Sequence, residues 1–238
     1  MRKLVVTLAV NGYAPRITEL TFPRIRKWSE KIGADFCVIN KRTRPELPAN
    51  CEKFQIYDLS KDYDWTMYLD ADTLVHEDAF DPTELIDKDC VLFNGIDFAG
   101  VRFNLDDPVF RRRKEKIGAC SWMVMCSDWT RDVWTPPEQQ DITFKHALSC
   151  IHPAEFERKF GYGPEHIVDD YLLSRNIARF GLNVKTLDRD IYPVIHCCGH
   201  FVHTYAVDEA YKLRFLKKHV QIWESHRIHD DSFIEGVE

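Results

Sequence analysis

The sequence predicts an α/β fold, and three observations predict this class. Residues 3–9 and 34–40 are apolar runs of strand length, and residues 17–32 between them carry apolar side chains at helical spacing. A third apolar run, residues 65–70, ends in carboxylates, as a buried strand does at the edge of a sheet. Because 238 residues can bury one substantial core, we expect a single compact domain over residues 1–238.

The remaining elements continue the alternation of strand and helix. We expect the first helix to start at Pro23 and to end at Gly33, because proline is favoured in the first turn of a helix and disfavoured inside it. Asp169 is expected to cap the helix that follows it. The charged segment 94–118 has the length of a mobile lid. We expect further helices or helical turns at residues 52–59, 78–86, 127–134, 146–160, 170–180 and 208–223, and strands at residues 90–93, 119–126, 184–187 and 191–195.

Charge and hydropathy argue against two classes of partner. The net charge is −6, which argues against a general nucleic-acid binder. No apolar stretch approaches the length of a membrane span, and the amphipathic segment 208–223 is expected to pack on the core. The apolar run after Met1 is too short for a signal peptide with a cleavage site. The eight cysteines are therefore expected to be reduced thiols in a cytoplasmic protein.

The strongest functional signal is the segment Asp70-Ala71-Asp72, which directly follows the third apolar run. Side chains two apart on extended backbone share a face, so the two carboxylates would lie close together. Like charges so placed are costly unless a cation lies between them. Hard carboxylate oxygens with few other ligands suit Mg²⁺ or Mn²⁺. The sequence therefore predicts a divalent-cation site at Asp70 and Asp72.

Three segments occur in order along the chain: residues 7–13 at the end of the first apolar run, residues 68–75 with an Asp-x-Asp, and residues 196–199 with a His-x-x-Gly. Together they resemble GT-A glycosyltransferases of the glycogenin and bacterial galactosyltransferase type, family 8, in which they correspond to the nucleotide-contacting end of the first strand, the D-x-D segment and the late H-x-x-G element. The resemblance implies a Rossmann-like mixed sheet flanked by helices. It also implies metal-dependent transfer of a hexose from a nucleotide sugar, a UDP-sugar, to a glycan or another hydroxyl acceptor. The implied division is a nucleotide-sugar half at residues 1–118, an acceptor and catalytic half at residues 119–205, and a C-terminal helix at residues 206–238.

The resemblance also assigns roles to individual residues. It implies Mn²⁺ or Mg²⁺ held by Asp70, Asp72 and His196, with His200 and His203 as competing candidates for the histidine ligand. The nucleotide would lie at the carboxyl end of the first strand, where open α/β sheets bind ligands. The residues that the resemblance places against the nucleotide are Leu8, Ala9, Asn11, Tyr13, Lys53, Asp70 and Ala71.

Asp169 and Asp170 are the predicted catalytic residues. They occupy the place of either a DQ-type element beside the donor sugar or an acidic pair that deprotonates the acceptor. An inverting transferase needs such a base, whereas the D-x-D and H-x-x-G segments favour retention. The chain departs from the family in having Cys120-Ser121-Trp122 where Asn-Ser-Gly is expected, and in lacking the K-P-W element after H-x-x-G.

Other classes of function fit the sequence less well. A phosphatase of the haloacid dehalogenase type also uses Mg²⁺ at an Asp-x-Asp, but on its first strand. A nucleotidyltransferase would need a glycine-rich phosphate loop after the first strand. A non-catalytic sugar-binding or zinc-binding module, with ligands from Cys197, Cys198 and their neighbouring histidines, would leave Asp70 and Asp72 unexplained.

Overall fold

Within the residues that the structure describes, six strands form a central sheet in the order β2-β1-β3-β6-β5-β7. The structure is a computed structural model and describes residues 1–95, 103–104, 107–112, 119–152, 161–195, 199–204 and 208–225. The strands are β1 (Lys3–Leu8), β2 (Ala34–Ile39), β3 (Trp65–Asp70), β4 (Leu74–Val75), β5 (Cys90–Phe93), β6 (Met123–Ser127), β7 (Asn183–Thr186) and β8 (Phe201–Val202). The α-helices are α1 (Pro15–Lys31), α2 (Ile56–Leu59), α4 (Phe144–Ser149), α6 (Val168–Phe180), α7 (Tyr192–Ile195) and α8 (Glu209–Glu224).

The sheet is mixed, and its register brings several chain segments to one edge. β1 is parallel to β2 and β3, with Leu8 opposite Asp70. β6 runs antiparallel to β3 and β5, so that Met123 lies opposite Leu69 and Val124 opposite Phe93. The carboxyl ends of β1, β3 and β5 therefore meet the start of β6. Residues that follow β3 and β5 come together there with the residues that precede β6.

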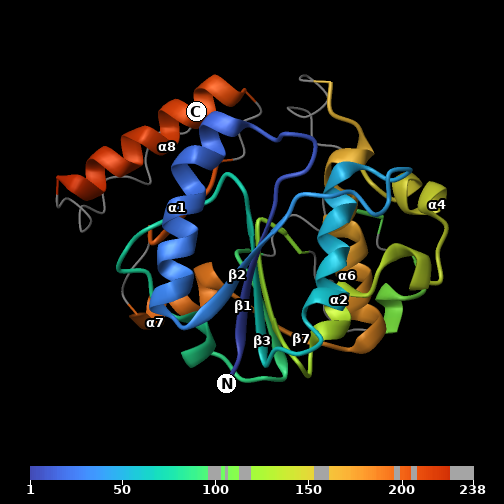
Figure 1. The fold of residues 1–238 in the computed structure, drawn as a ribbon. Coiled ribbons are helices and arrows are strands. Elements are labelled where there is room, and N and C mark those ends of the chain that lie inside the picture. Colours follow the sequence, from blue (N-terminus) through green and yellow to red (C-terminus); the bar gives the residue numbers. More distant parts are fainter. Residues whose placement is uncertain are drawn as a thin grey trace.

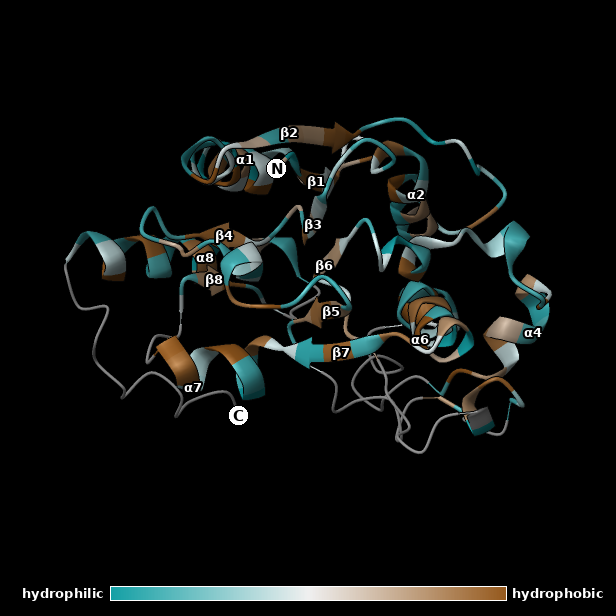
Figure 2. Ribbon diagram, turned by 90° about the horizontal axis from the view of Figure 1, so that it is seen from below, coloured by the Kyte–Doolittle hydropathy of each residue, from teal (hydrophilic) through white to brown (hydrophobic). Residues whose placement is uncertain are grey.

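Helices cover both faces of the sheet (Figures 1 and 2). Leu4 and Val6 of β1 belong to the core packed beneath α6, whereas Val5 belongs to the core beneath α1. This alternation follows from the two-residue period of a strand, which sends successive side chains to opposite faces. The predicted α/β class, with a mixed sheet flanked by helices in one domain, is confirmed.

Helix α1 corrects the expected start at Pro23. It begins at Pro15 and carries Pro23 in its interior, on an exposed position. The buried stripe of Ile17 and Ile25 runs past Pro23, and Thr21 Oγ1 between them donates to the carbonyl of Ala71 at 2.6 Å. An interior proline costs about 3 kcal/mol. Burial of this stripe on both sides of the proline offsets that cost.

Residues 191–195 are helical, so the expected strand there is wrong. A π-helical turn at Leu187–Ile191 continues into α7. Leu187 and Ile191 are both buried at a spacing of four, which is a helical period. Pro193 lies in α7, directly after the π-helical turn.

Other boundaries differ from expectation by a few residues. α6 begins at Val168, so Asp169 lies in its first turn and does not cap it. Strand β6 begins at Met123, because residues 119–122 turn into the cavity described below. The expected helix at residues 52–59 is a 3₁₀ turn, Ala49–Gln55, that continues into α2, and the expected helix at residues 127–134 is a 3₁₀ turn, Arg131–Trp134. Residues 153–160 and most of the segment 94–118, where we expected a helix and a lid, lie outside the described residues.

The C-terminal helix α8 packs on the core as expected. Leu213, Leu216 and Trp223 form one apolar cluster with Ile17 of α1 and Leu74 of β4. Figure 1 shows α8 beside α1. Among the described helices, none combines the length and the apolar character that crossing a bilayer requires.

Candidate functional site

A cavity of about 720 Å³ lies at the edge of the sheet where β1 and β3 end. The predicted site residues that line it are Leu8, Tyr13, Lys53, Asp70, Ala71, Asp72, Asp169 and Asp170. Ala9 and Asn11 are not among the described residues that line the cavity. The Ala9 amide donates to the carbonyl of Ile39 at 2.9 Å, and Asn11 is exposed in a turn with a φ of 57°. Ala9 and Asn11 therefore face away from the cavity, whereas Val10 between them lines it.

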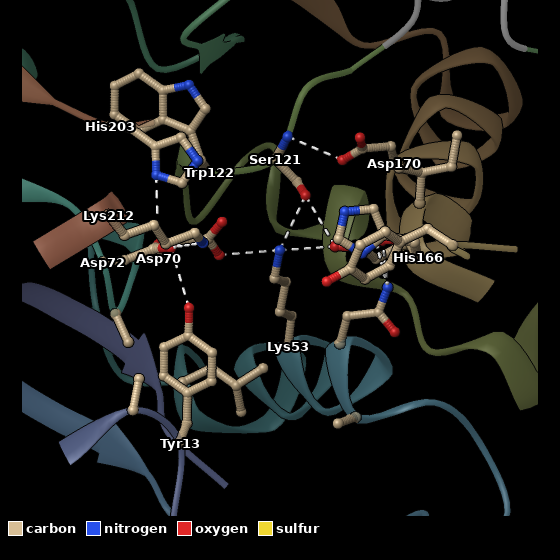
Figure 3. Close-up of a pocket in the computed structure, with 18 of the residues that line it drawn as sticks. Tyr13, Lys53, Asp70, Asp72, Ser121, Trp122, His166, Asp170, His203 and Lys212 are labelled. Atoms are coloured by element: carbon tan, nitrogen blue, oxygen red, sulfur yellow. Dashed lines mark hydrogen bonds and ion pairs between the residues drawn. The ribbon is translucent and has the colours of Figure 1, made fainter. Parts of the chain in front are cut away.

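Asp70, Asp72 and His203 form a compact acidic group in this cavity (Figure 3). Each offers one ligand atom, and these atoms all lie within 4.8 Å of one another. Asp70 ends β3, and a turn closed by the Thr73 amide and the Asp70 carbonyl at 2.9 Å leads to β4. Antiparallel pairing of Leu74 with Val202 then brings His203 beside Asp72. A histidine distant in sequence thus joins the D-x-D pair.

The structure does not place the other two candidate histidines, His196 and His200, in this group. His196 lies outside the described residues, so its predicted ligand role stays a prediction. His200 stacks on His76 instead, with ring centroids 5.5 Å apart and planes 8° from parallel. His203 is therefore the histidine that the described part of the chain offers to a cation at Asp70 and Asp72.

The two oxygens of Asp72 have different surroundings. Oδ2 accepts a hydrogen bond from Tyr13 at 3.0 Å and forms an ion pair with Lys212 of α8. Oδ1 faces His203 Nδ1 at 3.4 Å. Burial alone would raise the pKa of Asp72, but its contacts with His203 and Lys212 hold it well below its usual value. The carboxylate is therefore ionised, and one of its oxygens is fixed by protein groups.

This donor set fits a divalent cation. Carboxylate oxygens suit Mg²⁺ and Mn²⁺, and an imidazole adds a ligand that Mn²⁺ accepts readily. Protein groups that hold the second oxygen of a ligating carboxylate fix its orientation, and Tyr13 and Lys212 stand in that position at Asp72. Asp70, Asp72 and His203 therefore form a candidate metal site, because their ligand atoms lie close enough together to bind one cation.

Lys53 links the acidic group to α6. Its Nζ lies 3.1 Å from Asp70 Oδ1 and 2.7 Å from Asp169 Oδ2, and it donates to Ser121 Oγ at 3.0 Å. Burial alone would lower the pKa of Lys53, but Asp169 and Asp70 hold it well above its usual value. Lys53 is only 5% exposed. It is therefore a fixed buried cation that joins two carboxylates from different elements.

Asp169 and Asp170 have different partners although they are neighbours on α6. Asp169 accepts hydrogen bonds from Asn50 Nδ2 at 2.7 Å and from Ser121 Oγ at 2.9 Å, in addition to its contact with Lys53. Burial alone would raise the pKa of Asp169, but Lys53 holds it below the usual value. Asp170 accepts from the Ser121 amide at 2.9 Å and is only partly buried. Asp169 therefore belongs to a buried network, and Asp170 lies at the cavity wall.

Comparison by sequence finds no matching protein family and no matching curated protein. Comparison by structure finds similar solved structures. One is the crystal structure of a glycosyltransferase involved in the glycosylation of the major capsid of PBCV-1. The match covers 92% of this chain and 100% of that chain, with a TM-score of 0.51 and 13% sequence identity. The chain has a fold that resembles a glycosyltransferase fold. The finer resemblance to family 8 stays a prediction.

Tyr68, Ser121 and Lys212 are among the site residues that were not predicted from the sequence. Tyr68 donates to Asp70 Oδ1 at 2.5 Å, Ser121 contacts both aspartates of α6, and Lys212 pairs with Asp72. Tyr68 lies two residues before Asp70 on β3, which places it on the same face of the strand. That spacing was a usable signal for Tyr68. Ser121 was noted only as a departure from the family, and nothing in the amphipathic pattern of α8 distinguishes Lys212 from other polar residues.

Proposed function

We propose that this chain is a metal-dependent glycosyltransferase that moves a hexose from a nucleotide sugar, a UDP-sugar, to a hydroxyl group of a glycan or similar acceptor. The observation that carries the proposal is the group Asp70, Asp72 and His203 inside a large cavity at the carboxyl ends of β1 and β3. Open α/β sheets bind nucleotides at such edges. The glycosyltransferase-like fold supports the same activity.

In this proposal the metal ligands are Asp70, Asp72 and His203, with His196 kept as a further predicted ligand. A bound Mn²⁺ or Mg²⁺ would neutralise the charge that develops on the leaving diphosphate. Leu8, Tyr13 and Ala71 line the cavity, so they would contact the nucleotide. Lys53 forms ion pairs with Asp70 and Asp169, so its role would be to fix these carboxylates and not to bind the nucleotide directly.

We assign the catalytic role among the predicted pair to Asp170. The contacts of Asp169 described above are with the buried Lys53 and Ser121 and with the half-buried Asn50, and these protein groups would make it a positioning residue. Asp170 lines the cavity beside Ser121, so its carboxylate would face the reacting sugars. An inverting enzyme would use it as the general base, and a retaining enzyme would use it to stabilise positive charge at the anomeric carbon. We favour retention, on the family resemblance.

Calorimetry of UDP binding with and without Mn²⁺ tests this proposal. We expect binding that depends on Mn²⁺ and that is lost in Asp72→Asn, whereas Asp62→Asn, at an exposed position, binds as the unaltered protein does. Equal UDP binding with and without metal would contradict the proposal. A screen of nucleotide sugars for donor hydrolysis, followed by NMR of the anomeric product, would then identify the donor and the stereochemistry.

A phosphatase of the haloacid dehalogenase type is a weaker proposal. Its acidic motif is expected on the first strand, whereas Asp70 and Asp72 follow β3. Mg²⁺-dependent hydrolysis of a simple aryl phosphate would support the phosphatase proposal. This assay should be run beside the screen of nucleotide sugars.

A further inference from the structure

Trp122 and His203 stack face to face at the rim of the candidate metal site. Their ring centroids are 5.2 Å apart and their planes lie 10° from parallel. Figure 3 shows the two rings side by side above Asp72. Both residues line the cavity, and each lies directly beside a strand, Trp122 before β6 and His203 after β8. The Trp122 indole therefore covers one face of the His203 imidazole, which is the candidate ligand beside Asp70 and Asp72.

Trp122 is itself held from two strands. Its carbonyl accepts a hydrogen bond from the Asp70 amide at 2.8 Å, which ties it to the end of β3. Asn94, directly after β5, is 5% exposed. The side-chain amide of Asn94 is oriented with its oxygen towards the indole. This oxygen accepts hydrogen bonds from Trp122 Nε1 at 2.7 Å and from the Gly95 amide at 3.2 Å. The ring is thus fixed at its backbone and at its far edge.

His203 has less local support than the two aspartates. It follows β8, a strand of two residues, whereas Asp70 ends a strand of six residues that is paired on both sides. A ligating imidazole needs a fixed ring plane, which in metal sites is normally supplied by a neighbouring group. Stacking on a rigid indole supplies such a constraint, because aromatic rings in contact are stabilised beyond the burial of their apolar area.

We propose that Trp122 is a positioning residue that holds the His203 imidazole in the orientation needed to bind the cation. Asn94 holds Trp122 in turn. The inference rests on the proposed function for the ligand set, and it adds a residue at a position where the family that the sequence resembles carries glycine.

Mn²⁺ titration followed by electron paramagnetic resonance of the free ion, without nucleotide, tests the inference. The variants are His203→Ala, Trp122→Leu, Trp122→Phe and the double variant Trp122→Leu/His203→Ala. Trp129→Leu is the matched control, because Trp129 is 69% exposed. We expect Trp122→Leu to weaken Mn²⁺ binding about tenfold. Trp122→Phe, which keeps a ring on His203, should stay within about threefold of the unaltered protein.

The double variant separates positioning from a general structural role. If Trp122 acts through His203, the double variant binds Mn²⁺ no more weakly than His203→Ala alone. Additive losses would overturn the inference, as would normal binding by Trp122→Leu. If Trp122→Leu fails to fold, Asn94→Ala takes its place in the cycle. We expect Asn94→Ala to weaken binding only when His203 is present, and unchanged binding would overturn the inference.

The same titration distinguishes failure of this inference from failure of the proposed function. If the unaltered protein does not bind Mn²⁺, or if His203→Ala binds it equally well, the ligand set is wrong and the inference falls with it. If His203→Ala weakens binding but Trp122→Leu does not, the ligand set stands and only the role of Trp122 is lost.

Discussion

Lys53 Nζ lies 2.7 Å from Asp169 Oδ2, and both side chains are buried. This ion pair joins the 3₁₀ turn Ala49–Gln55 to α6 in the wall of the cavity. Removing one partner of a buried ion pair leaves an uncompensated buried charge, which is destabilising. Removing both partners leaves no buried charge and therefore costs less stability. The ion pair should therefore contribute to the free energy of unfolding of the protein.

We expect Lys53→Met to lower the free energy of unfolding by about 3–5 kcal/mol, because it leaves Asp169 buried without its cation. The double variant Lys53→Met/Asp169→Asn should regain more than half of that loss. Lys27→Met is the control, since its pair with Glu77 at 2.9 Å is largely exposed and is worth less than about 1 kcal/mol. Urea denaturation measures all three variants, and an equal loss in the single and double variants would contradict the assignment.

Asp169 should also contribute to acid sensitivity. Its pKa in the folded protein is held below the ordinary value of 3.8, so the stabilisation is complete above about pH 4 and is lost as the pH falls towards the folded pKa. The free energy of unfolding should therefore fall less steeply below pH 4 in Asp169→Asn than in the unaltered protein. Urea denaturation between pH 2.5 and 6, roughly the range over which carboxylates titrate, measures these slopes. Asp62→Asn should keep the original slope, and parallel curves for all three proteins would refute this role.

Lys212 places a positive charge directly on a candidate metal ligand. Like charges in proximity repel, so we expect Lys212→Met to bind Mn²⁺ several-fold more tightly in the absence of nucleotide. Lys217→Met, an exposed substitution on the same helix, should leave the affinity unchanged. Calorimetric titration of Mn²⁺ measures both. Weaker binding by Lys212→Met would mean that fixing Asp72 Oδ2 matters more than repulsion.

Asp170→Asn should reduce kcat of sugar transfer by about 100-fold or more, because it removes the negative charge that stabilises the anomeric carbon in a retaining reaction. Binding of Mn²⁺ and UDP should remain within about twofold, because Asp170 is not part of the proposed ligand set. Glu165→Gln, an exposed change at the rim of the same cavity, should keep normal turnover. Turnover assays with calorimetry separate the two effects, and a fall in UDP affinity that matches the fall in kcat would reassign Asp170 to binding.

Elements whose signals are local could be predicted from the sequence. β1, β2, β5 and α8 lie within a residue or two of their expected positions, because apolar runs and helical stripes are visible in short windows. Pro23 misled the prediction of α1, since the burial that offsets an interior proline comes from residues elsewhere in the chain. The strand expected at residues 191–195 failed because a short apolar run fits either a strand or a helix.

The site residues, too, could be predicted only where their signal is local in the sequence. Asp70 and Asp72 are recognisable because two carboxylates at the end of an apolar run are adjacent in sequence. His203 was only one of three candidate histidines, and it reaches Asp72 through the pairing of β4 with β8. Lys212 and Ser121 arrive from α8 and from the turn before β6, so only the tertiary structure reveals them. Residues contributed by distant segments leave no periodic pattern to detect.

The ion pair between Lys212 and Asp72 bears on how the protein is made. The ribosome synthesises Asp70 and Asp72 more than a hundred residues before Lys212, as the numbering shows. Until α8 emerges, a nascent chain holds a cluster of carboxylates without the lysine that balances Asp72. Domains synthesised in this order complete their buried charge pairs only late in translation. A ribosome-bound chain that ends before α8 should therefore differ from the finished protein in its affinity for cations, even where its sheet has already formed.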